Sequence, residues 1–323
     1  MFSLGIDIGG TKCAVILGKD KIPSDINELI IEKISFPTDV DRGHKEVIKE
    51  IIEKIDYILH KHNVEYKELI GIGISCGGPL DSKKGVINCP PNLPDWDSVP
   101  IVSILEEYFN VKVILHNDAN ACAVAEWRFG AGKNTENMVF LTFGTGMGAG
   151  IILNGKLYTG TNDMAGEVGH IRLTENGPVG YGKSGSFEGY CSGGGIRNLA
   201  LDIAKEYLRN NKKSILFETE SDLVSLSAKR IAEALKLNDE FALEVYSECA
   251  EKLGRGLSVI IDVLNPEKIV IGSIYERNHE FFLPRVTEVI KKEALSYSVG
   301  VCEIVPSALG DNIGDFASLG ILF

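Results

Sequence analysis

The segment Leu4–Lys12, LGIDIGGTK, places apolar side chains at every second position and then two adjacent glycines. An apolar residue at every second position is typical of a β-strand, and the glycine pair predicts a tight turn. Residues 3–17 therefore indicate a strand, a Gly-Gly turn and a returning strand. This hairpin at the start of the chain predicts an α/β fold, because strands and helical stretches alternate after it.

The same hairpin is a candidate phosphate site. Gly9 and Gly10 can take a positive φ and bring backbone N–H groups close to an anion, while Thr11 and Lys12 add a hydroxyl and a cation. Asp7, at the end of the strand, can hold a magnesium ion through water. Taken alone, an ordinary hairpin turn explains the glycines equally well.

A second turn has the same plan. Thr142–Gly150 reads TFGTGMGAG, lies between two short apolar runs and carries Thr145 at its tip. Two such turns, one in each half of the chain, predict two α/β domains that hold a polyphosphate in the cleft between them. We expect a small domain of residues 1–117 plus about 307–323, in which the last helix returns to the first domain, and a large domain of residues 118–306.

Helical periodicity marks seven further stretches of the chain. They are residues 44–62, 119–129, 197–209, 223–235, 239–264, 279–295 and 313–323. Residues 160–195, in contrast, have the character of a long loop.

Composition excludes several classes of function. The 323 residues carry a net charge of −12, which disfavours nucleic acid and an anionic membrane surface as partners. No stretch reaches the ~20 apolar residues of a membrane span, and the first residues lack the basic and apolar regions of a signal peptide. The seven cysteines are scattered singly, which is typical of reduced thiols and predicts a cytoplasmic protein.

Candidate catalytic and binding groups follow the strands. Asp118, in HNDANA, falls between a strand and a helix, where a carboxylate can accept a proton from a substrate hydroxyl. The alternative is that Asn117 or Asp118 only caps the helix. Glu167 and His170, in AGEVGH, can point into one pocket and hold neighbouring hydroxyls. Asn92 and Glu188 are further isolated polar groups beside proline or glycine, and His116 is interpreted as structural.

The segment Gly177–Gly189, GPVGYGKSGSFEG, matches the P-loop pattern G-x-x-x-x-G-K-[ST]. A P-loop needs a buried strand before it and a helix that begins at the Lys-Ser pair, because phosphate binds at the N-terminus of that helix. The preceding HIRLTEN is polar, and five glycines in the next eleven residues disfavour a helix. We therefore interpret the segment as a loop, and assign no chemistry to Lys183-Ser184.

Together the motifs resemble the ROK (repressor, open reading frame, kinase) family of sugar kinases, and among them the glucokinases. The resemblance covers nearly the whole chain, in the order LGIDIGGTK, ISCGGPLD, PPNLPDW, HNDANACAVAEWRFGAG, LTFGTGMGAGIILNG, AGEVGHI, FEGYCSGGG and NPEKIVIGS. It implies a two-domain actin-like ATPase (ribonuclease H-like) α/β fold with an interdomain cleft. It also implies a homodimer that uses ATP and Mg²⁺ to phosphorylate a hexose hydroxyl, usually O6. The family's repressors carry a DNA-binding domain before the first motif, for which we expect no room here.

By motif match, the resemblance assigns Asp118 as the general base. The sugar would be held by Gly78, Asn92, Asn117, Asp118, Glu167, His170 and Glu188. The nucleotide would be bound by Asp7, Gly9, Gly10, Thr11, Lys12, Gly144, Thr145, Gly146 and Gly272, with Asp7 also serving magnesium and Gly272-Ser273 near the adenosine.

One family feature is missing. The family usually has three cysteines between the histidine of AGEVGH and the glutamate of FEG, and with that histidine they bind a structural zinc. Those positions hold Val179, Tyr181 and Ser186 here, so we expect no zinc and a loop held by packing of Tyr181 and Phe187. Loss of the zinc ligands leaves open an alternative function, that of a non-catalytic sugar-sensing relative.

Overall fold

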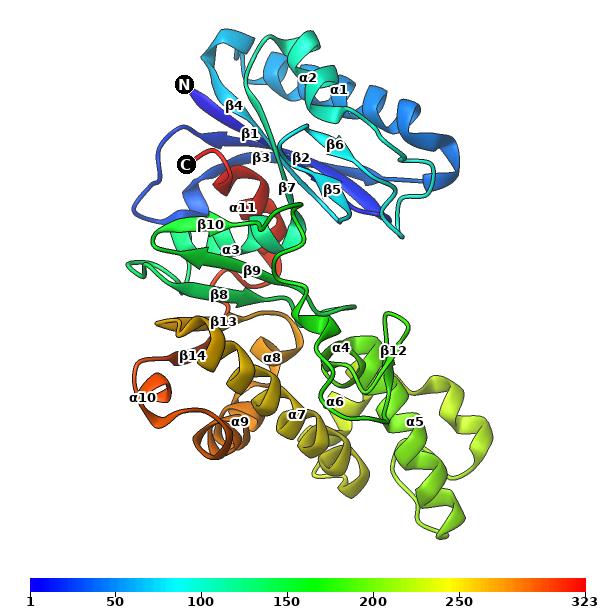
Figure 1. The fold of residues 1–323 in the computed structure, drawn as a ribbon. Coiled ribbons are helices and arrows are strands. Elements are labelled where there is room, and N and C mark those ends of the chain that lie inside the picture. Colours follow the sequence, from blue (N-terminus) through cyan, green and yellow to red (C-terminus); the bar gives the residue numbers. More distant parts are fainter. The chain divides into compact units, whose positions relative to one another are not determined.

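The computed structural model describes residues 1–323, which form two compact units. The first unit comprises Met1–Glu136, Gly150–Ala165 and Ala308–Phe323, and the second comprises Asn137–Ala149 and Gly166–Ser307. Figure 1 shows the elements of both units along the chain. No helix is both long and apolar enough to cross a membrane.

The first unit is built on a five-stranded sheet with the order β3-β2-β1-β4-β7. Strands β1, β4 and β7 are parallel, and β2 and β3 are antiparallel to their neighbours. Its strands are β1 (Phe2–Ile8), β2 (Lys12–Lys19), β3 (Ile30–Pro37), β4 (Leu69–Cys76), β5 (Leu80–Asp81), β6 (Val86–Ile87), β7 (Val113–Asn117) and the hairpin of β9 (Ala149–Leu153) and β10 (Lys156–Tyr158). Its helices are α1 (Gly43–Lys61), α2 (Ile101–Phe109), α3 (Asp118–Phe129) and α11 (Ile313–Gly320).

The alternation in β1 separates the two faces of this sheet. Leu4, Ile6 and Ile8 are buried in the core that α1 and α2 complete (Figure 1). The opposite face carries Gly5, where an added Cβ would lie 2.2 Å from the Ser318 Oγ of α11. Glycine therefore lets α11 approach the sheet, and Asp7, two residues further along β1, lies on this α11 face.

The last segment of the chain is fixed to α3 by a buried carboxylate. Glu126 of α3 accepts hydrogen bonds from the backbone N–H groups of Ala308, at 3.1 Å, and Leu309, at 3.0 Å. A buried charge requires such partners, so this contact holds α11 in the first unit. The expected boundary near residue 117 differs from this division because α3 packs against α11 and thus lies in the first unit.

The second unit combines three parallel strands, in the order β8-β13-β14, with most of the helices. Its strands are β8 (Met138–Leu141), β11 (Val179–Gly180), β12 (Lys183–Ser184), β13 (Lys268–Ile271) and β14 (Glu303–Pro306). Its helices are α4 (Phe187–Tyr190), α5 (Gly193–Arg209), α6 (Ala228–Lys236), α7 (Glu240–Leu264), α8 (Ile274–Arg277), α9 (His279–Glu293) and α10 (Ser296–Val299). One continuous apolar core, which includes Tyr246 and Phe282, holds these elements together.

Two stretches differ from the sequence-based expectation. The helix predicted over 223–235 is divided into a 3-10 helix, Glu220–Ser225, and α6, with the side chain of Ser227 as the N-cap of α6. The predicted loop over 160–195 contains the small β11–β12 hairpin and the single turn of α4. The helices α6 and α4 begin where the side chains of Ser227 and Ser186 accept backbone hydrogen bonds as N-caps.

Candidate functional site

The glycine turn between β1 and β2 is shaped by close packing. An added Cβ on Gly10 would lie 2.5 Å from the backbone oxygen of Asn92, so only glycine lets these two segments meet. Neither Gly9 nor Gly10 has a positive φ, which corrects the expected reason for the pair. Thr38, which follows β3, holds the turn in place, because its backbone N–H donates to the Thr11 oxygen at 3.0 Å.

Asn117 and Asp118 have separate tasks at the start of α3. The Asn117 side chain accepts the N–H of Asn120 at 2.9 Å and is the N-cap of the helix. Asp118 is the first helical residue, and one of its carboxylate oxygens accepts the N–H of Ala119 at 2.8 Å. Asn117 supplies the cap, and no other residue donates a hydrogen bond to the second carboxylate oxygen of Asp118.

Three carboxylates lie in the same part of the first unit. Burial, together with the negative charges of Asp315 and Asp118, raises the pKa of Asp7 to about 7. Surrounding protein also raises the pKa of Asp118, although solvent reaches this side chain. Asp315 belongs to α11 and forms a 2.6 Å ion pair with Lys33. Asp7 beside a second carboxylate would offer Mg²⁺ the oxygen ligands that it prefers.

Sequence patterns did not single out Asp315 or Lys33. They are 282 positions apart, and only the packing of α11 against the first sheet brings them together. An acidic residue in the otherwise apolar segment IGDFASLG was the available signal.

The remaining predicted sugar residues of the first unit lie beside Asn117 and β4. An added Cβ on Gly78 would be 3.7 Å from the Asn117 Nδ2, and one on Gly77 would be 3.4 Å from the Asn92 Oδ1. The two asparagines therefore flank the glycine loop that follows β4. Asn92 is exposed and free of internal hydrogen bonds, which leaves its amide available to a ligand.

In the second unit, the turn after β8 holds Glu188. The Glu188 Oε2 accepts the N–H of Met147 at 3.0 Å, and an added Cβ on Gly146 would lie 2.9 Å from the same oxygen. Glu188 is on α4, whose N-cap is the fully buried Ser186. Serine at this position thus fixes the one-turn helix, and the helix aims Glu188 at the second glycine turn.

Glu167 and His170 surround a 3-10 turn, Val168–His170, that packs on the same β8 turn. Gly169 is essential to this packing, since an added Cβ would be 2.3 Å from the Met147 oxygen. Both Glu167 and His170 are exposed at the surface of the second unit. The structure therefore brings Glu188 and the turn of Glu167 and His170 to one glycine turn.

A cavity of about 660 Å³ lies next to this turn within the second unit. Its walls include Gly144, Thr145 and Ser273, and Ser273 has the unusual backbone angles φ 59° and ψ −111°. The N-terminus of α5 supplies Gly193, whose N–H donates to the Gly144 oxygen at 2.7 Å. The volume is in the range of small-molecule sites. Gly272 precedes Ser273 and is not itself in the wall.

Sequence reasoning missed part of this cavity. The walls also contain Gly194, Ala228, Lys229, Ala232, Glu233, Lys236, Tyr246, Ile274, Arg277 and Asn278. Most of these are ordinary helix residues of α6, α7 and α8, and no local pattern distinguishes them from surface or core positions.

In the segment that matches the P-loop pattern, the Lys-Ser pair makes hydrogen bonds that hold the surrounding loop together. Lys183 is in β12, and its Nζ donates to the His170 oxygen at 2.7 Å, while the Ser184 Oγ donates to the Gly177 oxygen at 3.0 Å. No helix begins at this Lys-Ser pair, because α4 starts only at Phe187. The pattern match is thus explained by hydrogen bonds within the loop.

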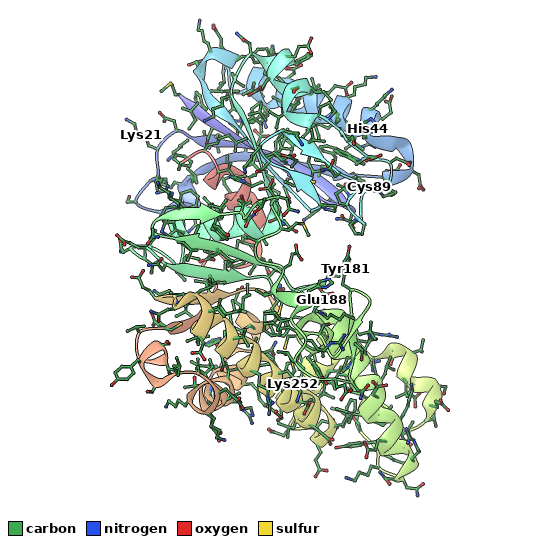
Figure 2. The ribbon with its side chains drawn as sticks, in the orientation of Figure 1. Lys21, His44, Cys89, Tyr181, Glu188 and Lys252 are labelled. Atoms are coloured by element: carbon green, nitrogen blue, oxygen red, sulfur yellow. The ribbon has the colours of Figure 1, made fainter.

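The expected packing of this loop is half right. Phe187 is fully buried, and it packs so closely on α7 that an added Cβ on Gly256 would lie 2.4 Å from its ring. Tyr181, in contrast, is 69% exposed and only meets the edge of the His170 ring, with 5.3 Å between ring centroids. Both Tyr181 and Glu188 come from this segment (Figure 2). The hydroxyl of Ser186, which donates to the Gly180 oxygen at 3.3 Å, adds the link that Tyr181 does not provide.

We expect purified protein to contain well under one equivalent of zinc, measured by elemental analysis after dialysis against metal-free buffer. A structural zinc site needs about four nitrogen or sulfur ligands, and no group of three or more His, Cys, Asp or Glu side chains is arranged to hold a metal. A chelator should therefore leave the melting temperature unchanged. Stoichiometric zinc, or unfolding by the chelator, would contradict this interpretation of the loop.

A model of the ROK family matches residues 3–318. The chain belongs to the ROK family. It is 30% identical over 320 residues to a glucokinase of Thermotoga maritima, a match that covers 99% of this chain and 96% of the relative. It is also 28% identical over 292 residues to a xylose repressor of Caldicellulosiruptor bescii, covering 90% and 70% of the two chains.

Solved structures agree with this assignment. The structure of a ROK family glucokinase from Streptomyces griseus in complex with glucose and AMPPNP matches with a TM-score of 0.74 and 27% identity, over 99% of this chain and 98% of that chain. The ROK chain thus has the α/β fold of the actin-like ATPases, as the motifs implied.

Proposed function

We propose that this ROK protein is an ATP-dependent hexose kinase, which transfers the γ-phosphate of ATP to a sugar hydroxyl, O6 of glucose or of an N-acetylhexosamine. The observation that carries the proposal is the arrangement at the start of α3. Asn117 caps the helix, so the exposed Asp118 keeps one carboxylate oxygen that accepts no hydrogen bond from another residue. A general base requires such an oxygen beside the reacting hydroxyl. The names of the glucokinase relatives support the same reaction.

Asp118 would act as the general base. A carboxylate at this position accepts the proton of the attacking sugar hydroxyl, which is the part of phosphoryl transfer that a side chain must perform. The raised pKa of Asp118 makes the carboxylate a stronger proton acceptor than a fully solvated aspartate. Solvent access to the side chain keeps it reachable by the substrate.

The other residues would bind and orient. The amides of Asn92 and Asn117, next to Gly78, would supply donors and acceptors for sugar hydroxyls. The exposed Glu167 and His170 and the half-buried Glu188 would supply the others. The N–H groups of Gly9 and Gly144 already donate to Lys12 and Gly146 within their turns, so Gly10 and Thr11 in the first turn, and Thr145 and Gly146 in the second, would bind the phosphate oxygens. The cavity beside Ser273 would take the adenosine. Asp7 would hold Mg²⁺, which when bound neutralises charge on the phosphates. The proposal includes a cytoplasmic homodimer that binds neither nucleic acid nor membrane.

A panel of hexoses and N-acetylhexosamines in a coupled ADP-release assay tests the proposal. We expect one or more sugars to raise ADP release at least tenfold above the sugar-free rate, in the kcat range of about 1–10³ s⁻¹ that is typical of enzymes. A sugar that binds by calorimetry without increasing ADP release would instead favour the sensing function, as in the repressor relatives.

A further inference from the structure

A second cavity, of about 530 Å³, lies wholly within the first unit and has no role so far. The β5–β6 hairpin forms one wall with Pro79, Leu80, Lys83 and Asn88, and the segment after β10 forms the other with Asp163 and Met164. The two walls are joined at one point, where the Asp163 carboxylate accepts the N–H of Ser82 at 2.7 Å and its hydroxyl at 2.9 Å. Asp163 is 9% exposed, so this junction is buried and the cavity is a built feature of the unit.

The cavity adjoins the proposed sugar residues at Gly78. Pro79 directly follows Gly78 in the chain. Asp163, in the opposite wall, is near enough to His116, the residue before Asn117, for its charge to raise the pKa of that histidine against the larger lowering effect of burial. The His116 Nδ1 is buried and has no hydrogen-bond partner. A ligand that is held by Gly78 and Asn117 therefore has this cavity next to it.

The polar groups of the cavity are free to bind a neutral polyol. The side chains of Lys83, Asn88 and Asn162 make no hydrogen bond or ion pair within the protein, whereas Lys84 is neutralised by Asp81 at 3.0 Å. Amide groups both donate and accept, which suits hydroxyl groups. Pro79, Leu80 and Met164 add apolar surface for the C–H face of a sugar ring.

We infer that this cavity is a subsite for a second sugar ring, so that the kinase accepts a glucose disaccharide as well as the free hexose. The inference rests on the proposed function, because it places the reacting ring at Gly78 and Asn117. Size favours a ring over an acetyl group: the volume is in the range of a complete small-molecule site, and an acetyl group would leave most of it to water.

The test compares glucose with cellobiose and maltose as substrates of the full-length protein and of Thr161→Trp. Thr161 is exposed, lies in the cavity wall and makes no hydrogen bond, so an indole there fills the cavity without removing an interaction. Lys156→Trp, which adds the same side chain on exposed β10 outside the cavity, is the matched control. We expect wild type to phosphorylate at least one disaccharide with a kcat/KM within about tenfold of that for glucose.

Thr161→Trp is expected to raise the KM for that disaccharide about tenfold or more and to leave the KM for glucose within about twofold. The unchanged glucose KM also shows that the variant is folded. The inference is overturned if glucose or N-acetylglucosamine is phosphorylated but neither disaccharide is, or if both tryptophan variants act alike. If no sugar is phosphorylated, the proposed function fails, and calorimetric binding of the disaccharides, lost in Thr161→Trp, still decides whether the subsite exists.

Discussion

Asp118→Asn is expected to lower kcat by about 10²–10⁴, the range for the loss of a general base, while the protein remains folded. An asparagine keeps the size of the side chain and the hydrogen bond from the Ala119 N–H, but it cannot accept the substrate proton. The coupled ADP-release assay at saturating sugar and ATP measures the loss. The KM for the sugar should change much less, since binding groups remain.

The helix itself should tolerate this substitution, because the N-cap is Asn117 and not Asp118. Loss of a negative charge in the first helical turn costs about 0.3–1 kcal/mol, a small effect on thermal unfolding. Glu53→Gln, which removes a carboxylate from the exposed face of α1 in the same unit, is the matched control and should retain near-full activity. Turnover of Asp118→Asn within tenfold of wild type would remove Asp118 from the role of base.

The glycine motifs show how far local sequence could predict this site. The two turns were identified because a strand, a glycine pair and a returning strand form a pattern within about fifteen residues. The reason for glycine at position 10 was misjudged. Its lack of a side chain makes room for the backbone of Asn92, which is 82 positions further along the chain, and no local pattern reveals that contact. Gly5 was read only as part of an alternation, although it makes room for α11.

Elements held by tertiary contacts were harder to predict than elements with local signals. The long helices α1, α5 and α7 follow from their apolar periodicity. The short α2, IVSILEEYF, was missed because its apolar run resembles a strand and begins after proline. Similarly, the cavity beside Ser273 depends on how α5, α6 and α8 pack together, so most of its lining could not be found from spacing.

The acidic group around Asp7 could be recognised only in part for the same reason. Asp7 itself ends a predictable strand, but Asp315 reaches it from the other end of the chain. Their proximity has a thermodynamic consequence that sequence alone does not indicate. A carboxyl that is held beside other carboxylates destabilises the folded protein whenever it is ionised.

Asp7→Asn is therefore expected to stabilise the ligand-free protein at pH 8 and to give no gain at pH 4. The folded-state pKa of Asp7, about 7, is above the ordinary 3.8, so folding favours the protonated form. The stability that this preference contributes is fully present below pH 4 and is lost as the pH rises through 7. Three pKa units correspond to at most about 4 kcal/mol at pH 8, and partial solvent access reduces the expected gain to about 1–3 kcal/mol.

Urea unfolding at pH 4, 6 and 8 measures this difference, with Glu53→Gln on the exposed face of α1 as a control for the loss of one negative charge. The gain in the free energy of unfolding should grow from pH 4 to pH 8 in Asp7→Asn alone. The order should reverse when MgATP is present, because wild type gains binding energy through Asp7 that the asparagine variant lacks. A variant that is less stable than wild type at every pH would contradict this prediction. It would show that the negative charge of Asp7 is compensated in the folded protein, and that repulsion among Asp7, Asp118 and Asp315 does not limit the stability of the first unit.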